Sequence, residues 1–275
     1  MRKIFMLTLI SILFFTSAAF AKGTQEYGVF IGMPKSKVLK LKNYSVLVVD
    51  AQYLSKANIT RLHKNKNQKI YSYLNVGSIE NFRPYYSDFK SITLGNYDNW
   101  PEEKWVDVSR GKWQKFILSK GKEFRKKQID GLLIDNADVY YHYRKKKIYN
   151  GLTAILKSLK AQKMDVVING GDTYVLKAVK ENPKQKYIDG INQETVFSKI
   201  DFKNKKFTKQ STGARAYYLS YCKKAKRAGL SVYLLEYTIS KSLKKQISAF
   251  CKAKGYKYYI SKSIELDIEG GGKSD

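Results

Sequence analysis

Short apolar runs alternate with amphipathic segments along most of the chain, and this alternation limits the fold more than any other feature of the sequence. Several runs are continuously apolar, such as Val-Leu-Val-Val at 46–49 and Val-Val-Ile at 166–168. Strands of a parallel sheet have this composition because helices cover both faces of the sheet. The predicted strands are 27–31, 45–50, 69–76, 131–135, 165–169, 187–193, 231–236 and 257–260.

Helical periodicity fills the intervals between these strands. Apolar residues recur at helical spacing at 113–124 and at 148–159, and similar patterns cover 55–62, 175–179, 216–228 and 243–251. Eight strands alternating with helices in the roughly 250 residues that follow residue 21 predict an α/β protein with one (β/α)8 TIM-barrel domain. The alternative is a doubly wound open sheet, but no glycine-rich phosphate loop follows the first strand.

Residues 1–21 have the layout of a secretory signal peptide. Arg2 and Lys3 precede an apolar run at 4–15, and a small-x-small cleavage motif at 19–21 precedes Lys22. The apolar run is too short to cross a bilayer. An N-terminal helix retained in the fold is the alternative. The sequence therefore predicts a signal peptide at 1–21, a barrel domain at 22–275, no membrane span, and a secreted or periplasmic monomer.

The chain is strongly basic, with 52 Lys and Arg against 23 Asp and Glu and a formal net charge of +29. Such a field can attract anionic envelope polymers to the protein. Nucleic acid is a possible partner on charge alone. Because no recognition motif accompanies the charge, we expect no specific nucleic-acid partner.

Histidine and cysteine are scarce. His63 and His142 are the only histidines, so a Ser-His-Asp or Cys-His mechanism has little support, and no metal-type spacing is present. We therefore predict neither a metal site nor a cofactor. Cys222 and Cys251 fall in the last two predicted helices, where they either form a disulfide or pack as buried thiols.

Acidic residues lie at the ends of several predicted strands. Asp50, Asp135 and Glu236 end the second, fourth and seventh strands, and Glu194 follows the sixth. In a TIM barrel these ends meet at one face, where active sites are built. Paired carboxylates without histidine favour glycoside hydrolysis, in which one acid protonates the leaving oxygen while the other attacks or activates water. The alternatives are a divalent ion held by the acids of the fourth and seventh strands, and helix caps.

Aromatic residues follow the same strands. Tyr140 follows the fourth strand, Tyr237 follows the seventh, and Trp100 and Trp105 lie in the long third loop. Flat rings beside carboxylates suit the apolar faces and hydroxyl rims of sugars. Alternatively, these rings pack the loops against the barrel. We include Tyr140 and Tyr237 among the predicted substrate-binding residues.

Several motifs together resemble the endo-α-1,4-polygalactosaminidase family, glycoside hydrolase family 114. They are Tyr-Ser-Tyr-Leu-Asn-Val-Gly-Ser at 71–78, Trp-Val-Asp-Val at 105–108, Asp-Gly-Leu-Leu-Ile-Asp-Asn-Ala-Asp-Val-Tyr at 130–140, Ile-Asn-Gly-Gly at 168–171, Ile-Asn-Gln-Glu at 191–194 and Leu-Glu-Tyr at 235–237. At the last of these motifs the family more usually has an Asp-Tyr pair. The likeness extends along nearly the whole chain after residue 21.

This resemblance implies a TIM-barrel hydrolase that cleaves an α-1,4-linked galactosamine polysaccharide. It points to Asp135 and Glu194 as the catalytic carboxylates, with Asp135 as nucleophile and Glu194 as general acid/base of a retaining mechanism. The reverse assignment stays open. A barrel that binds polysaccharide or envelope polymer without cleaving it is the alternative function. The residues that the resemblance places around the substrate are Asp50, Tyr73, Asn136, Asp138, Asn169 and Glu236.

Overall fold

The computed structural model describes residues 25–269, and it confirms the predicted TIM barrel. All strand pairings in the barrel are parallel, in the order β1-β2-β3-β7-β8-β9-β12-β13. These strands are β1 (Gly28–Phe30), β2 (Val46–Val49), β3 (Lys69–Asn75), β7 (Gly131–Asp135), β8 (Asp165–Asn169), β9 (Gly190–Glu194), β12 (Ser231–Tyr237) and β13 (Lys257–Ser261). Each one overlaps a predicted strand. The predicted signal peptide lies outside the described residues.

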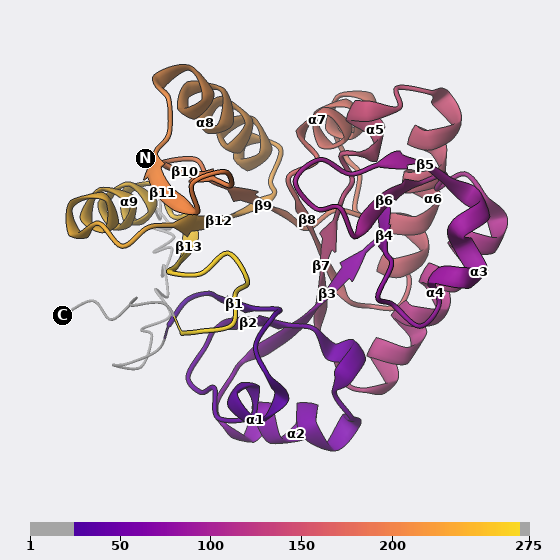
Figure 1. Cartoon of the computed structure of the whole chain (residues 1–275), viewed down its shortest axis with the longest axis horizontal. Helices are drawn as coiled ribbons and strands as arrows, with labels where there is room; N and C mark the ends of the chain where they lie inside the picture. Colours follow the sequence, from indigo (N-terminus) through magenta and orange to yellow (C-terminus); the bar gives the residue numbers. More distant parts are fainter. Residues whose placement is uncertain (1–24, 270–275) are drawn as a thin grey trace, which may run out of the picture.

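Helices surround the ring of strands (Figure 1). The larger ones are α2 (Lys56–Lys64), α4 (Gly111–Lys126), α6 (Lys146–Lys160), α7 (Asp172–Glu181), α8 (Thr212–Arg227) and α9 (Lys241–Lys254), and the short ones are α1 (Lys35–Val38), α3 (Tyr86–Phe89) and α5 (Val139–His142). The apolar periodicity that predicted α4 and α6 forms their buried faces, including Trp113, Phe124, Ile148 and Leu159. Strands and helices therefore share one core.

The first and last strands of the barrel meet through side chains. The rings of Phe30 in β1 and Tyr259 in β13 lie 5.1 Å apart, at an angle of 65°. Tyrosines also fill much of the barrel interior: Tyr27 packs on Tyr233 at 4.8 Å, and Tyr71 donates a hydrogen bond to Asp165. Because each ring carries a hydroxyl, this interior needs polar partners that a branched aliphatic core would not.

Two insertions depart from simple βα alternation. After β3 the chain forms a three-stranded antiparallel sheet of β4 (Ser78–Glu80), β5 (Thr93–Asn96) and β6 (Glu103–Val106), and after β9 it forms a hairpin of β10 (Ser198–Asp201) and β11 (Lys206–Lys209). The rings of Trp100 and Phe202, one from each insertion, contact each other edge-on at 6.0 Å. Both insertions leave the barrel at the carboxyl ends of its strands. We call this end the barrel mouth.

The strands that carry the predicted catalytic acids end in unusual backbone conformations. Asn136 and Thr195, which directly follow Asp135 and Glu194, adopt the left-handed region with φ of 63° and 55°. This conformation is strained for non-glycine residues, most of all for β-branched threonine. The chain therefore turns sharply after each acid.

Cys222 and Cys251 are free thiols in this structure, and both are fully buried in the helical layer. Burial raises the pKa of Cys222 to about 12. The two residues thus pack as small apolar groups, which is one of the two alternatives that the sequence left open.

Candidate active site

Asp135 and Glu194 meet at the barrel mouth through the side chain of Asn169. The Asn169 Nδ2 atom donates to Asp135 Oδ1 at 3.0 Å and to Glu194 Oε1 at 2.8 Å. These residues end three consecutive strands, β7, β8 and β9, so the sheet order itself brings them together. Because both bonds come from one nitrogen, Asp135 Oδ1 and Glu194 Oε1 are separated by less than the sum of these two distances.

A tyrosine binds the outer oxygen of each acid. Tyr73 donates to Asp135 Oδ2 at 3.0 Å, and Tyr237 donates to Glu194 Oε2 at 2.8 Å. Both rings are buried. Every carboxylate oxygen of the pair therefore accepts a hydrogen bond, which fixes the plane of each carboxylate.

Two further buried residues orient Asn169. Asn192 Nδ2 donates to Asn169 Oδ1 at 2.7 Å, and the Tyr27 hydroxyl donates to Asn192 Oδ1 at 3.1 Å. Since the Asn169 oxygen is occupied by a donor, its Nδ2 must face the acids. The hydrogen-bonded chain from Tyr27 through Asn192 to Asn169 is called the amide relay below.

Burial shapes the electrostatics of the pair. It raises the pKa of Asp135 and that of Glu194, and the hydrogen bonds from Asn169 oppose the rise in both cases. The charge of Asp135 raises the pKa of Glu194 further. Among residues 25–269, no lysine or arginine forms an ion pair with either acid. A carboxyl group whose pKa is raised by burial and by a neighbouring charge suits general acid catalysis.

Asn136 connects the site to the antiparallel insertion. Its Nδ2 donates to Ser78 Oγ at 2.8 Å and to Glu103 Oε2 at 3.2 Å, and its Oδ1 accepts from the Tyr97 hydroxyl at 3.0 Å. Tyr97 in turn stacks on Trp105, with ring centres 4.4 Å apart. The side chain of Asn136 is thus occupied by protein partners and holds the third loop over the mouth.

The two carboxylate oxygens of Asp138 accept from the Gly171 amide at 3.2 and 3.1 Å, and Gly171 is the N-cap residue of α7. Burial raises the pKa of Asp138 to about 7. Its side chain forms no cap of its own helix, α5. The carboxyl group instead joins the ends of β7 and β8, beside the candidate pair.

An arginine forms an ion pair with Asp50. Its Oδ2 lies 2.9 Å from Arg83 Nη1, and the same guanidinium binds Glu80 at 3.0 Å through Nη2. Asp50 also accepts from the backbone amide of Gln52. The structure therefore places Asp50 in an ion-pair network beside the third loop.

Glu236 points away from the barrel interior. Its carboxylate accepts from the amides of Phe197 and Ser198 at 3.0 and 2.9 Å and from the Ser198 hydroxyl at 2.5 Å, with no side-chain exposure. Neighbouring strand residues face opposite sides, and Tyr237 reaches Glu194 on the inner side. Asp135 and Glu236 are therefore not brought together, as a shared metal ion would require.

Tyr140 is also directed elsewhere. Its ring packs against Tyr149 at 5.4 Å and Tyr174 at 6.4 Å, among helices α5, α6 and α7. The structure thus brings together Asp135, Glu194, Tyr73, Asn169 and Tyr237, and surrounds them with Asn136 and Asp138. Asp50, Tyr140 and Glu236 contact other parts of the protein.

The sequence did not predict site roles for Asn192, Tyr27 and Tyr97. Asn192 precedes Glu194 by two positions on one strand, so strand alternation could have placed both on the inner face. The contact of Tyr27 with Asn192 could be predicted only by knowing that β1 lies across the barrel from β9. No sequence pattern indicates the role of Tyr97, because only the folded third loop directs its hydroxyl toward Asn136.

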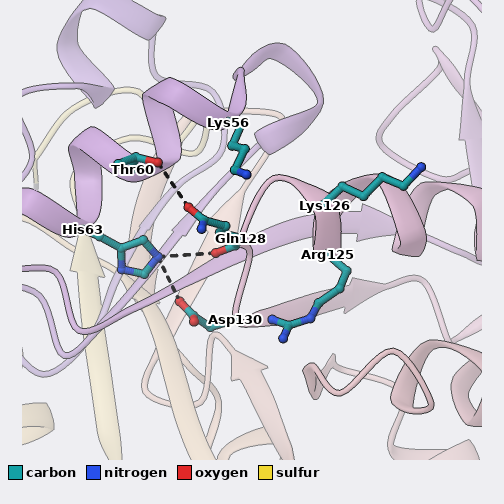
Figure 2. A pocket seen from close by; sticks show the side chains of 7 residues that line it. All are labelled: Lys56, Thr60, His63, Arg125, Lys126, Gln128 and Asp130. Carbon is teal, nitrogen blue, oxygen red and sulfur yellow. Dashed lines mark hydrogen bonds and ion pairs between the residues drawn. The ribbon is translucent and has the colours of Figure 1, made fainter.

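A separate pocket of about 600 Å³ lies between α2 and the end of α4 (Figure 2). It is lined in part by Lys56, His63, Arg125 and Asp130, and His63 Nε2 is 3.5 Å from Asp130 Oδ2. Asp130 precedes β7 while Asp135 ends it. The pocket is therefore distinct from the candidate site.

A parallel eight-stranded barrel with two hydrogen-bonded carboxyl groups at its mouth has the architecture of a TIM-barrel glycoside hydrolase. The model of glycoside-hydrolase family GH114 matches residues 17–270, and the chain belongs to this family. It is therefore a glycoside hydrolase. No curated protein matches the chain.

Solved structures share the fold at low identity. The glycoside hydrolase domain of PelA from Pseudomonas aeruginosa has a TM-score of 0.72 at 17% identity, covering 90% of this chain and 96% of that one. Aspergillus fumigatus Ega3, in complex with galactosamine, has a TM-score of 0.68 at 17% identity, covering 89% and 93%. An alpha-galactosidase from Thermus thermophilus has a TM-score of 0.59 at 8% identity, covering 89% and 59%.

Proposed function

We propose that this protein is a secreted enzyme that cleaves α-1,4-linked galactosamine-containing polysaccharide by means of Asp135 and Glu194. The observation that carries the proposal is the single amide of Asn169 bound to both carboxylates. Family membership and the likeness to Ega3, solved with galactosamine, support the choice of sugar. In the part of the chain that the structure describes, no lysine or arginine pairs with these acids, and such a site also suits an amino sugar.

The mechanism follows from the two acids. Asp135 attacks the anomeric carbon while Glu194 donates its proton to the leaving glycosidic oxygen, so the chain breaks and a glycosyl ester forms. Glu194 then takes a proton from water, which attacks the ester and releases Asp135. The rise in the pKa of Glu194 next to the Asp135 charge supports its role as the acid.

The close approach of the acids favours retention of anomeric configuration. Retaining enzymes hold their carboxyl groups about 5 to 5.5 Å apart, whereas inverting enzymes need about 6.5 to 9.5 Å to admit a water molecule. Here one nitrogen lies 3.0 and 2.8 Å from an oxygen of each acid. Proton NMR during hydrolysis tests this step: the α anomer should appear first, and initial formation of the β anomer would contradict retention.

Fragment analysis of partly deacetylated galactosaminogalactan tests the activity. The wild-type protein should release short oligosaccharides, and Asp135→Asn and Glu194→Gln should each lower the rate by about 10³-fold or more, because each removes a group that acts in the transition state. A matched control is Glu181→Gln, which alters an exposed ion pair with Lys177 in α7. Polymer binding without cleavage by the wild-type protein would support the non-catalytic alternative.

We also propose that the strongly basic surface attracts anionic envelope polymers. The full sequence has a formal net charge of +29, and loss of Arg2 and Lys3 with the signal peptide leaves 29 − 2 = 27 positive charges. The exported protein is therefore expected to associate with anionic envelope polymers and to act there as a monomer. Among residues 25–269, no helix is long and apolar enough to cross a membrane. Added salt should release the protein from such polymers, since screening weakens attraction between exposed charges.

A further inference from the structure

Two aromatic rings lie largely in solvent beside the third loop. Tyr53 is 60% exposed and Phe82 is 61% exposed, in a protein whose other aromatic side chains are mostly covered. Tyr53 ends the short 3-10 helix η1 (Ala51–Tyr53) directly after β2, and Phe82 follows β4. Both therefore lie on the mouth side of the barrel.

One buried arginine supports both rings. The Arg83 guanidinium carbon lies 5.6 Å from the centre of the Tyr53 ring and 5.2 Å from that of Phe82, and Arg83 Nη1 donates to the Tyr53 hydroxyl at 3.1 Å. Arg83 is only 5% exposed and is fixed by Asp50 and Glu80 at 2.9 and 3.0 Å. We call Tyr53 and Phe82, with Arg83 between them, the aromatic platform.

Stability alone does not explain the buried ion pairs that hold Arg83 against the two rings. Replacing buried ion pairs by apolar groups is often neutral or stabilising, and here Arg83 Nε has no hydrogen-bond partner in the described part of the chain. What the network does achieve is to fix the Arg83 guanidinium against two exposed rings. A preorganised surface of this kind lowers the entropy that a ligand must lose on binding.

The platform is connected to the candidate active site. Glu80 ends β4, which begins with Ser78, and the Ser78 hydroxyl accepts from Asn136 at 2.8 Å, next to Asp135. The charge of Glu80 is also among the causes that raise the pKa of Asp135. The platform therefore lies on the Asp135 side of the pair, toward β2 and β3.

We propose that the aromatic platform binds a sugar ring of the polysaccharide chain away from the bond that is cleaved. This inference rests on the proposed function. The apolar face of a pyranose ring can stack on an exposed aromatic ring, and the formal charge of Asp50, Glu80 and Arg83 together is −1, which favours a cationic amino sugar over an anionic one. Such a distal contact lets the enzyme bind within a long chain.

Binding can be measured without cleavage in an Asp135→Asn background, by calorimetric titration with α-1,4-linked galactosamine oligosaccharides of increasing length. Phe82→Ala should weaken binding of long oligosaccharides by about tenfold. The shortest oligosaccharides, which do not reach the platform, should bind as before. Tyr53→Ala should have a similar effect, and the double variant a larger one. A platform substitution that leaves the affinity for long chains unchanged would overturn the inference.

Two variants separate stacking from general apolar contact. Phe82→Leu keeps an apolar side chain but loses the flat face, so it should behave like Phe82→Ala, whereas Tyr53→Phe keeps the ring and should retain most of the affinity. Because both rings are largely exposed, thermal melting should stay near that of the parent protein. Wild-type affinity in Phe82→Leu would contradict a stacking role.

Kinetics distinguish failure of this inference from failure of the proposed function. In a chain with Asp135 intact, Phe82→Ala should raise KM for long substrates by about tenfold and leave kcat unchanged, as expected for a contact made equally in the ground and transition states. Ring-dependent binding without any wild-type hydrolysis would contradict the proposed function alone. Hydrolysis with KM insensitive to both rings would contradict the platform alone.

Discussion

Asn169 can act between two acids only in one of its two amide orientations. A flipped side chain would place its oxygen between Asp135 and Glu194 and repel both. Asn192, whose side chain is fully buried, prevents this by donating to the Asn169 oxygen. Asn192 is therefore a positioning residue, and Tyr27 positions it in turn.

We predict that Asn192→Leu lowers kcat by about 10²-fold, because a misplacement near 1 Å has that cost. The hydrogen bonds from Asn169 lower the pKa of both acids, so their loss should move the whole pH–rate profile to higher pH. Tyr27→Phe should produce the same shift in milder form. Tyr174→Phe is the control, since its hydroxyl contacts Thr153 in the helical layer. An unchanged pH profile would count against the amide relay.

At the scale of elements, the insertions after β3 and β9 distinguish this barrel from a plain repeat. The hairpin after β9 begins where Glu236 binds Phe197 and Ser198, and its far end meets Trp100 of the other insertion through Phe202. Glu236 therefore determines how one side of the mouth is built, although it contacts neither candidate catalytic acid.

Glu236→Gln should destabilise the protein by about 1–3 kcal/mol, since one amide group would face backbone donors that need an acceptor. Hydrogen exchange should quicken first at Ser198 and along the hairpin. The pKa of Glu236 is raised to about 7 from an ordinary 4.5, so the folded wild type binds more protons and loses stability as pH rises between these values. Glu236→Gln has no titrating group at this position, so its stability should not fall with pH for this reason.

Two measurements can refute this prediction. The difference in unfolding free energy between the wild type and Glu236→Gln should shrink from about pH 4.5 to about pH 7, and a widening difference would show the wrong sign. Glu181→Gln, at an exposed ion pair in α7, should leave hairpin exchange unchanged.

For the molecule as a whole, we expect buried carboxyl groups to dominate the pH dependence of stability between about pH 5 and pH 8. The pKa values of Glu103, Asp138 and Glu236 are raised to about 7, and those of Asp135 and Glu194 are raised as well, in every case mainly by burial. Each group binds its proton more tightly folded than unfolded. Ionising these groups therefore lowers the free energy of unfolding, whereas ionising an exposed acid with an ordinary pKa does not.

The melting temperature should fall as pH rises from about 5 to about 8, because the folded state gives up protons that it prefers to keep. Calorimetry tests this prediction. Constant ionic strength keeps the screening of repulsion among the many lysines the same at every pH. A melting temperature that increases over this range would contradict the assignment. Below about pH 4, loss of paired carboxylates such as Asp165 with Lys69 should reverse the trend.

Export is also a property of the whole chain. We predict cleavage after residue 21, so that the exported protein begins at Lys22. Mass spectrometry of the intact protein from the culture medium or envelope fraction would identify this terminus. Recovery of the full chain from the cytoplasm alone would contradict it.

Much of the fold was predictable because its signals are local. Apolar runs such as 132–134 indicated strands buried on both faces, and the periodicity around Trp113 and Ile148 indicated covering helices. The antiparallel insertion after β3 was not predicted. Its strands are short and partly exposed, and they pair only after the third loop has folded back on itself.

The sequence by itself determined the barrel and the positions of Asp135, Asn169 and Glu194 at its mouth, because consecutive strands of a parallel barrel bring their carboxyl ends together. Only the tertiary structure decided which acids share that mouth. Glu236 and Tyr237 are neighbours in sequence, yet the pleat directs one outward and the other inward. Asp50 follows a strand of the same sheet, but its carboxylate pairs with Arg83, 33 positions later, at 2.9 Å. Strand ends are fixed by local pattern, whereas the partner of a side chain depends on which distant segments the fold brings to it.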